Sequence, residues 1–331
     1  MNRFILIRYS VLGKEIGKFW RLIRFSQQGI RLCLTAFLFL SLPGQNFYQT
    51  IRISAQPPLV RKAPFSLPTP APYPERVGSL SPPSITASSA IVLDDESKVV
   101  LFAKNPKERL PPASLTKIVT ALVALDHYNL DDVLVVRRLF SEGSQMGLFE
   151  GEKISVRNLL YGLLLSSGND AGFTLADNIS GGIEQFIGYM NKKVARLGLQ
   201  DTHFTNPIGE DEQEHYSTAW DIAHLVSFAM KNSTFAQIVN TSHKFVSNYN
   251  QTQWHELENI NILLKENLGV KGVKTGWTEK AGGCFAGFAQ RGNRKIIVVV
   301  LGSKDKYTRF EDAKALIEWT FATYEWRAIN H

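Results

Sequence analysis

The sequence predicts an α+β domain in which one antiparallel sheet is formed by both ends of the globular part and is flanked by helices. Short apolar runs near the start and the end of this part have the length of β-strands, and helices are expected in the chain between them. Because strands lie at both ends, the sheet is expected to be completed when the two ends meet. The expected strands are residues 90–93, 99–102, 269–278, 284–289 and 295–301.

Local patterns support each expected element. Residues 94–98 form a polar run between the first two strands and predict a hairpin turn. Residues 269–278 alternate and are rich in Gly, which suits a strand that another backbone approaches closely. Residues 118–125 are almost entirely apolar and predict a helix that is buried on all sides. Further helices are expected at residues 156–165, 171–179, 183–197 and 313–324.

A Ser-x-x-Lys pair, Ser114 and Lys117, opens the buried helix. Its spacing places both side chains on one face of the first helical turn. A serine hydroxyl needs a base within hydrogen-bond reach to act as a nucleophile, and a neutral lysine can supply it. The structural alternative is a helix cap at Ser114 and a surface lysine at Lys117. A second pair, Ser303 and Lys306, has no apolar helix behind it and is interpreted as a solvated polar turn.

Two further motifs follow in order along the chain. Ser167 and Asn169 flank a glycine at which the chain can turn sharply, so both side chains are expected on the same side of the loop. Lys274-Thr275-Gly276 lies in the Gly-rich strand and offers a charge and a hydroxyl to an anionic substrate. Each motif alone is weak, but the ordered set indicates acyl transfer through a serine ester.

With these motifs, the chain resembles the serine-type D-Ala-D-Ala carboxypeptidases, the low-molecular-mass penicillin-binding proteins of the β-lactamase/transpeptidase-like fold. The resemblance covers residues 86 to about 325. The patterns that carry it are 112–117 (Pro-Ala-Ser-Leu-Thr-Lys), 167–171 (Ser-Gly-Asn-Asp-Ala), 202–207 (Thr-His-Phe-Thr-Asn-Pro), 216–219 (Tyr-Ser-Thr-Ala) with 221–223 (Asp-Ile-Ala), 259–264 (Asn-x-Asn-x-Leu-Leu), and 274–276 (Lys-Thr-Gly) with 280–282 (Lys-Ala-Gly).

The resemblance implies a hydrolase that removes the terminal D-Ala from peptidoglycan stem pentapeptides and that penicillin acylates. Ser114 is then the nucleophile and Lys117 the base, while Ser167 and Asn169 relay the proton and hold Lys117 and the substrate. Burial and the like charge of Lys274 are expected to lower the pKa of Lys117. The implied substrate-binding residues are Lys274, Thr275 and Gly276, and the implied oxyanion hole is formed by the backbone N–H groups of Ser114 and Trp277.

Other activities of the same fold remain open. A DD-endopeptidase or a transpeptidase differs in the bond or the acceptor, and an inactive penicillin-binding scaffold is a further alternative. A class A β-lactamase needs a Glu-x-x-x-Asn loop, and none of Glu210, Glu212 and Glu214 has Asn four residues on. The chain departs from the common family pattern at Glu210, where Leu is frequent, at Ile260, where some members have Arg, and at Trp277, where some have His.

The N-terminal part differs in composition from the rest. Residues 1–85 carry 11 Lys and Arg against 2 Asp and Glu, a balance of +9, whereas the whole chain carries +7, so residues 86–331 carry −2. The high pI therefore does not indicate nucleic-acid binding. The predicted parts are a basic cytoplasmic n-region at 1–31, a signal peptide or N-terminal membrane anchor at 32–44, a Pro-rich linker at 45–85 and the DD-peptidase catalytic domain at 86–328.

These parts predict an exported, extracytoplasmic protein that is either secreted or anchored to the membrane by its N-terminal segment. The seven His residues lack metal-binding spacing, and the two cysteines, Cys33 and Cys284, form no disulfide framework. We therefore expect no metal and no cofactor. The expected partners are peptidoglycan stem peptides, β-lactam antibiotics as covalent inhibitors, and the membrane.

Overall fold

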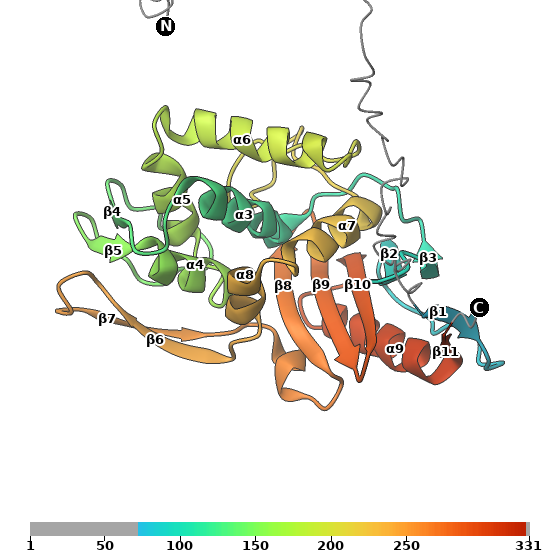
Figure 1. Ribbon diagram of the computed structural model, residues 1–331. Coiled ribbons are helices and arrows are strands. Elements are labelled where there is room, and N and C mark those ends of the chain that lie inside the picture. The colour runs from blue at the N-terminus through green and yellow to red at the C-terminus, as the bar shows by residue number, and fades with distance from the viewer. Residues whose placement is uncertain (1–71, 329–331) are drawn as a thin grey trace, which may run out of the picture. The chain divides into compact units, whose positions relative to one another are not determined.

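The computed structural model describes residues 72–328, and its centre is a five-stranded antiparallel sheet (Figure 1). Strands from the start of the domain pair with strands from its end, because β2 lies beside β10. This confirms the predicted fold class. The sheet order is β3 (Val100–Lys104), β2 (Ser89–Asp94), β10 (Arg294–Ser303), β9 (Gly282–Arg291) and β8 (Val270–Thr278).

Helices cover both faces of the sheet, so its central strand is buried on both sides. In β10, Ile297 and Val299 face one apolar cluster, whereas Ile296 and Val298 face the other. The larger cluster holds α3 (Lys117–His127), α4 (Val156–Leu164), α5 (Asn169–Asp177), α6 (Gly182–Arg196), α7 (Ala219–Ala229) and α8 (Ser233–Val239). The smaller cluster holds α9 (Thr308–Thr323) and η2 (Ile262–Lys265).

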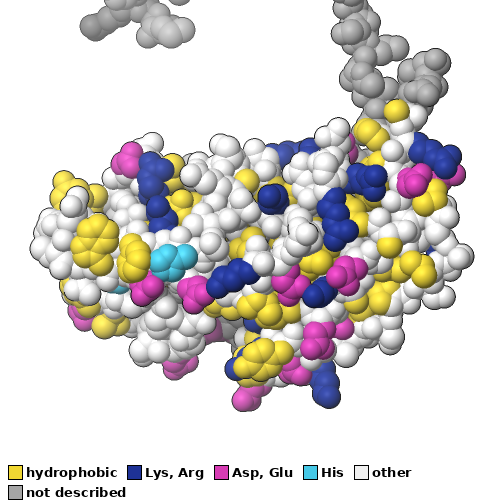
Figure 2. Space-filling view, turned by 90° about the horizontal axis from the view of Figure 1, so that it is seen from below, with side chains coloured by type: hydrophobic (Ala, Val, Ile, Leu, Met, Phe, Trp, Pro, Cys, Tyr) yellow, Lys and Arg dark blue, Asp and Glu magenta, His cyan; other side chains and the backbone are white. Residues whose placement is uncertain are grey.

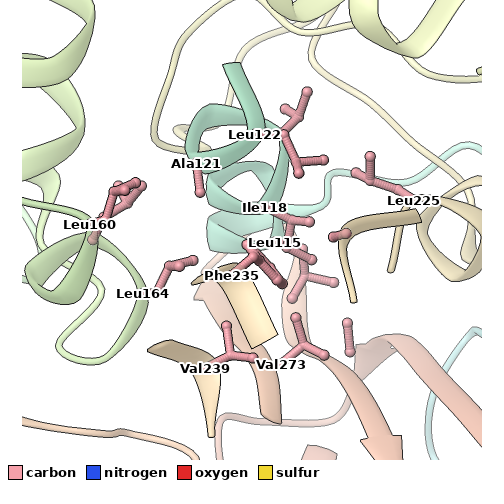
Figure 3. Packing of buried hydrophobic residues seen from close by; sticks show 14 of the residues in the cluster. Leu115, Ile118, Ala121, Leu122, Leu160, Leu164, Leu225, Phe235, Val239 and Val273 are labelled. Carbon is pink, nitrogen blue, oxygen red and sulfur yellow. The ribbon is translucent and has the colours of Figure 1, made fainter. Parts of the chain in front are cut away.

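Helix α3 is buried all round, as its sequence predicts. Ile118 and Leu122 pack among side chains of the neighbouring helices, and Phe235 of α8 lies between α3 and strand β8 (Figure 3). Val239 of α8 faces Val273 of β8 in the same cluster. The first turn of α3 is thereby held against the sheet, which fixes the position of Ser114 and Lys117.

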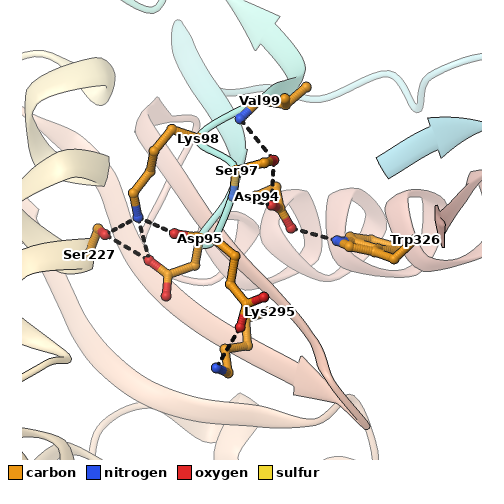
Figure 4. A network of polar contacts seen from close by, with 9 residues as sticks. Asp94, Asp95, Ser97, Lys98, Val99, Ser227, Lys295 and Trp326 are labelled. Carbon is orange, nitrogen blue, oxygen red and sulfur yellow. Dashed lines mark hydrogen bonds and ion pairs between the residues drawn. The ribbon is translucent and has the colours of Figure 1, made fainter. Parts of the chain in front are cut away.

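The polar turn between β2 and β3 joins three parts of the domain (Figure 4). Asp94 accepts a hydrogen bond from the Trp326 indole at 2.6 Å, and Asp95 accepts one from Ser227 of α7 at 2.7 Å. Lys98 donates to Ser227 and forms an ion pair with Asp95 at 2.9 Å. The predicted hairpin is confirmed, and its turn also fastens α7 and the C-terminal strand.

Three two-stranded pairings were not predicted from the sequence. Strand β1 (Tyr73–Arg76) pairs with β11 (Tyr324–Arg327), so a strand lies within residues 45–85, which were predicted to be a linker. Strands β4 (Val133–Val135) and β5 (Lys153–Ser155) form a second pair. Strands β6 (His243–Ser247) and β7 (Trp254–Glu258) form the third, a hairpin that extends from the body of the domain.

Two further observations concern the sequence predictions. Ser303 is buried and donates a hydrogen bond of 2.8 Å to Asp312, so it is not part of a solvated turn as expected. The predicted n-region and the signal or anchor segment at 1–44 lie outside the described residues. Within residues 72–328, no helix has both the length and the apolar character that crossing a membrane requires.

Candidate active site

Ser114 and Lys117 lie side by side at the start of the buried helix. Ser114 is in the 3₁₀ turn η1 (Ala113–Thr116), which runs directly into α3. Lys117 Nζ donates to Ser114 Oγ at 2.9 Å. Neither end of this turn has a side-chain cap, so Ser114 is not the helix cap that the structural alternative proposed. The hydroxyl is free to react and has an amine within hydrogen-bond reach.

Lys117 is fully buried, and its other hydrogen bonds go to neutral oxygens. Nζ donates to Asn169 Oδ1 at 2.7 Å and to the Ile208 carbonyl oxygen at 2.9 Å. Burial disfavours the charged ammonium and lowers the pKa of Lys117 to about 7, although the carboxylates of Glu210 and Asp170 oppose this change. The amine is therefore neutral in an appreciable fraction of molecules at neutral pH.

Asn169 is held by the loop that follows residue 141. Its Nδ2 donates to the Glu142 carbonyl oxygen at 2.9 Å, and its backbone N–H donates to the Ser144 carbonyl oxygen at 2.7 Å. The neighbouring Asp170 carboxylate accepts hydrogen bonds from the backbone N–H groups of Met146, Gly147 and Leu148. One buried carboxylate thus shapes the loop, and the loop orients the amide that binds Lys117.

The Ile208 carbonyl is fixed by a second loop. Asn206 Oδ1 accepts hydrogen bonds from the N–H groups of Ile208, Gly209 and Glu210 at 3.2, 2.7 and 3.0 Å. Gly209 has a φ of +92°, and a Cβ there would lie 1.9 Å from the Ala113 carbonyl oxygen. Only glycine allows this loop to approach the nucleophile turn so closely.

Strand β8 lies against the same turn on another side. A Cβ at Gly276 would lie 2.9 Å from the Ser114 backbone nitrogen, so the glycine allows the strand and the nucleophile turn to touch. The Gly276 carbonyl oxygen accepts a hydrogen bond of 2.5 Å from Arg309 of α9. Trp277 follows, and its half-exposed side chain lines the cleft above Ser114.

Lys274 and Thr275 are both buried beside this turn. Lys274 Nζ donates to the Thr275 carbonyl oxygen at 2.9 Å. Burial lowers the pKa of Lys274 well below its usual value, and the charges of Lys117 and Arg309 lower it further. The effect of burial on Lys117 agrees with the sequence prediction. Repulsion between the two amines disfavours the state in which both are protonated.

Ser167 differs from the other predicted residues. It is 3% exposed and has a φ of +59°, a region that non-glycine residues rarely occupy. Within residues 72–328 its hydroxyl makes no hydrogen bond to Ser114 or Lys117, whereas Asn169 bonds Lys117 directly. The structure therefore brings Asn169 into the polar cluster, and the relay role of Ser167 stays a prediction.

An open cleft of about 500 Å³ lies over the nucleophile turn, and Lys117, Lys274, Thr275 and Ser167 are not among the residues that line it. Ser114, Asn169 and Trp277 line it together with three carboxylates, Glu142, Glu210 and Glu279. Burial and the nearby charges of Glu142 and Glu212 raise the pKa of Glu210. Within the described part of the chain, no three His, Cys, Asp or Glu side chains are arranged to hold a metal ion. The cleft thus offers a hydroxyl and a nearly neutral amine to a carbonyl substrate.

A histidine behind the nucleophile turn was not identified from the sequence. The Thr205 N–H donates to His215 Nδ1 at 3.1 Å, so the ring proton lies on Nε2 and is donated to Thr116 Oγ1 at 2.8 Å. Thr116 in turn donates to the Ala113 carbonyl oxygen at 2.9 Å. Burial lowers the pKa of His215 to about 4, which keeps the ring neutral. Asp170 and Asn206 are part of the quoted motifs, but the sequence did not show their roles.

Comparisons with known proteins agree with this geometry. A family model described as D-alanyl-D-alanine carboxypeptidase matches residues 76–305. The D-alanyl-D-alanine carboxypeptidase DacF of Bacillus subtilis is 35% identical over 247 residues, which cover 72% of this chain and 63% of that protein. A D-alanyl-D-alanine endopeptidase of Pseudomonas aeruginosa is 33% identical over 253 residues, which cover 74% of this chain and 81% of that protein.

A solved structure shows the same fold. The Streptomyces K15 DD-transpeptidase matches with a TM-score of 0.70 and 34% identity, covering 73% of this chain and 100% of that one. The chain spans 63% to 66% of the length of DacF and of three further bacterial carboxypeptidases. Since the family model matches more than two thirds of the residues, the chain belongs to the D-alanyl-D-alanine carboxypeptidase family.

Proposed function

We propose that the chain is a serine DD-carboxypeptidase that removes the terminal D-Ala from peptidoglycan stem pentapeptides and is inactivated by penicillin. The observation that carries the proposal is the 2.9 Å hydrogen bond between Lys117 Nζ and Ser114 Oγ, combined with a lysine pKa of about 7. A buried amine that is partly neutral near pH 7 can accept the hydroxyl proton as the ester forms.

The reaction begins with attack of Ser114 Oγ on the carbonyl carbon of the penultimate D-Ala. Lys117 takes the hydroxyl proton, and the backbone N–H groups of Ser114 and Trp277 stabilise the oxyanion. Loss of such stabilisation typically costs about 10²–10³ in rate. The amide bond then breaks as the proton taken by Lys117 is relayed through Ser167 to the leaving amine of D-Ala, and water hydrolyses the ester to free Ser114 and the shortened peptide.

The remaining polar residues position the enzyme and the substrate. Asn169 holds Lys117 and faces the cleft, where it can also bind the substrate amide. Lys274 and Thr275 bind the terminal carboxylate of the peptide. The carboxylate favours the charged form of the Lys274 amine, which it binds as an ion pair, and it accepts a hydrogen bond from the Thr275 hydroxyl. Gly276 keeps the strand against Ser114, so that the two N–H groups of the oxyanion hole come from adjacent segments.

The covalent step has a direct test. The intact mass of the full chain after incubation with benzylpenicillin is expected to rise by one penicilloyl group, and Ser114→Ala is expected to remove this adduct. Ser144→Ala is the matched control, because Ser144 is exposed and its hydroxyl also lines the cleft. An adduct that survives in Ser114→Ala and disappears in Ser144→Ala would contradict the assignment of the nucleophile.

The related activities are distinguished by the products that each one forms. Release of free D-Ala from a pentapeptide supports the carboxypeptidase. Cleavage of cross-linked dimers without D-Ala release would favour an endopeptidase, and transfer to an added amine would favour a transpeptidase. Rapid turnover of penicillin would point to a β-lactamase. If no penicilloyl adduct formed, the remaining interpretation would be an inactive penicillin-binding-like scaffold.

We also propose that residues 1–44 direct export and that the catalytic domain acts outside the cytoplasm, either secreted or anchored to the membrane by its N-terminal segment. Support comes from the basic region followed by an apolar run, and from the extracytoplasmic location of peptidoglycan. Protease treatment of intact cells or spheroplasts is expected to digest the catalytic domain. Protection of the domain until the cells are lysed would contradict the proposal.

A further inference from the structure

The β6–β7 hairpin presents a row of exposed aromatic rings on its outward face. Phe245 and Trp254 are 56% and 57% exposed, and both lie on this face because their strand neighbours Val246 and His255 are buried. Phe245 is opposite Glu256, and Trp254 lies one diagonal step away, within reach of a single extended ligand. The His243 ring contacts Phe245 edge to face at 4.9 Å between ring centres.

The inward face holds the hairpin rigidly against the domain. His255 Nε2 lies 2.6 Å from Glu152 Oε1, and both side chains are buried. Asn158 of α4 donates to the Ser247 carbonyl oxygen at 2.8 Å, and the Tyr249 N–H donates to the Lys153 carbonyl oxygen at 2.7 Å. The backbone that carries the exposed rings is therefore held in place before any ligand arrives, which lowers the entropy cost of binding.

The hairpin also touches the loop that forms one wall of the catalytic cleft. A Cβ at Gly147 would lie 3.8 Å from His255 Nδ1, and the Gly147 N–H donates to Asp170 at 2.9 Å. The adjacent Asn169 holds Lys117 at 2.7 Å. Rigid contacts thus connect the aromatic face to the cleft, so a polymer bound on the hairpin keeps a fixed relation to the nucleophile.

The charges beside the rings decide between possible partners. Glu256 and Glu258 lie on the same outward face and are mostly exposed, while Lys265 pairs with Glu258 at 2.7 Å. Figure 2 shows hydrophobic side chains at the end of the domain where the hairpin lies, with a histidine and acidic side chains beside them. An anionic lipid surface or a polyanion would be repelled by Glu256, which lies beside the His243 ring and, among the described residues, is not paired with a Lys or Arg side chain.

We propose that the outward face of the β6–β7 hairpin binds the neutral glycan strand of peptidoglycan, with the sugar rings stacked on Phe245 and Trp254. The C–H face of an N-acetylated pyranose is apolar and packs on an aromatic ring, while its hydroxyl and amide edges hydrogen-bond to carboxylate and imidazole groups. An exposed apolar patch rimmed by polar residues is typical of a binding surface. This assignment of a substrate polymer rests on the proposed function.

The test uses the full chain with its cleft closed by benzylpenicillin. Chitotetraose, an uncharged oligomer of N-acetylglucosamine without peptide, is titrated by isothermal calorimetry. We expect saturable binding that weakens at least tenfold in the double variant Phe245→Ser/Trp254→Ser. The matched control is Tyr307→Ser, since Tyr307 is equally exposed at 66% but belongs to another part of the domain. Substitutions of exposed side chains change the free energy of unfolding little, and circular dichroism verifies that each variant is folded.

The outcomes separate the two proposals. No binding by the wild-type chain, or equal binding by the wild type and the double variant, would overturn the glycan site. Loss of partition onto neutral or anionic lipid vesicles in the double variant, without any chitotetraose binding, would also overturn it in favour of a lipid surface. D-Ala release from a soluble pentapeptide is measured on the same proteins without penicillin. Failure of that release contradicts the proposed function and leaves the sugar titration interpretable.

Discussion

Arg309 donates a hydrogen bond of 2.5 Å to the carbonyl oxygen of Gly276, the strand residue against which Ser114 packs. Arg309 is 6% exposed, and burial lowers its pKa to about 10. Burying a guanidinium group costs desolvation free energy. Here the buried group holds strand β8 in place through its hydrogen bond to Gly276. Helix α9 thereby fixes the catalytic end of β8 although none of its residues lines the cleft.

Replacing Arg309 by Met is expected to slow acylation by benzylpenicillin about 10²-fold, the usual cost of a misplaced reacting group. The physical reason is that the end of β8 loses its partner and the Ser114 and Trp277 amides separate. The rate is measured by stopped-flow or by mass spectrometry. Arg157→Met is the control, because that arginine forms an ion pair on the surface with Asp131. An unchanged rate in a folded Arg309→Met protein would contradict the positioning role.

Gly209→Ala is expected to lower the free energy of unfolding by about 2–4 kcal/mol, since it combines a left-handed φ with a Cβ that meets the Ala113 carbonyl. Gly276→Ala is expected to reduce acylation through its contact with the Ser114 nitrogen. The control is Gly188→Ala within α6, where no atom lies within 4 Å of the new Cβ. The free energy of unfolding of Gly188→Ala is expected to increase by about 0.5–1 kcal/mol. Urea unfolding tests Gly209→Ala and Gly188→Ala, and the rate of acylation by benzylpenicillin tests Gly276→Ala. An unperturbed Gly209→Ala would be inconsistent with the close approach.

The acylation rate is expected to depend on pH through Lys117. Below its pKa of about 7 the amine is protonated and cannot act as a base, so the rate falls roughly tenfold for each pH unit. The Glu210 carboxylate raises the pKa of Lys117. Glu210→Gln is therefore expected to move the midpoint of the pH profile to lower pH. Glu150→Gln, at an exposed site, serves as the control. A midpoint that moves upward in Glu210→Gln would refute this coupling.

His215 makes stability depend on pH in the acid range. Its pKa is about 4 in the folded protein and 6.5 in the unfolded chain, so the unfolded chain binds more protons between these values. Stability is therefore retained above pH 6.5 and decreases as the pH falls towards 4, by about 3 kcal/mol. His215→Asn is expected to reduce this slope in urea unfolding between pH 7 and pH 4. An identical slope in the wild type and the variant would argue against a neutral buried ring.

The fold class and the central catalytic pair follow from local sequence because both depend on short patterns. A continuous apolar run marks β10, and the three-residue spacing of Ser114 and Lys117 fixes their contact in any helical turn. Arg309 could not be identified in this way, since its partner lies 33 positions earlier in the chain and no motif surrounds it. The buried pair Glu152 and His255, 103 positions apart, depends likewise on tertiary packing.

The pairing of both chain ends in one sheet also determines the stage of protein synthesis at which the candidate site can form. During synthesis, β2 is made long before β10, its neighbour in the sheet. In the same way, β1 can pair only after β11 has been synthesised at the end of the domain. Contacts so distant in sequence form late in folding. Ser114 is synthesised early, but Gly276 and Arg309 are among the last parts of the domain to arrive. A nascent or C-terminally truncated chain that lacks Gly276 and Arg309 is therefore expected to carry Ser114 without the arrangement on which the proposed acylation depends.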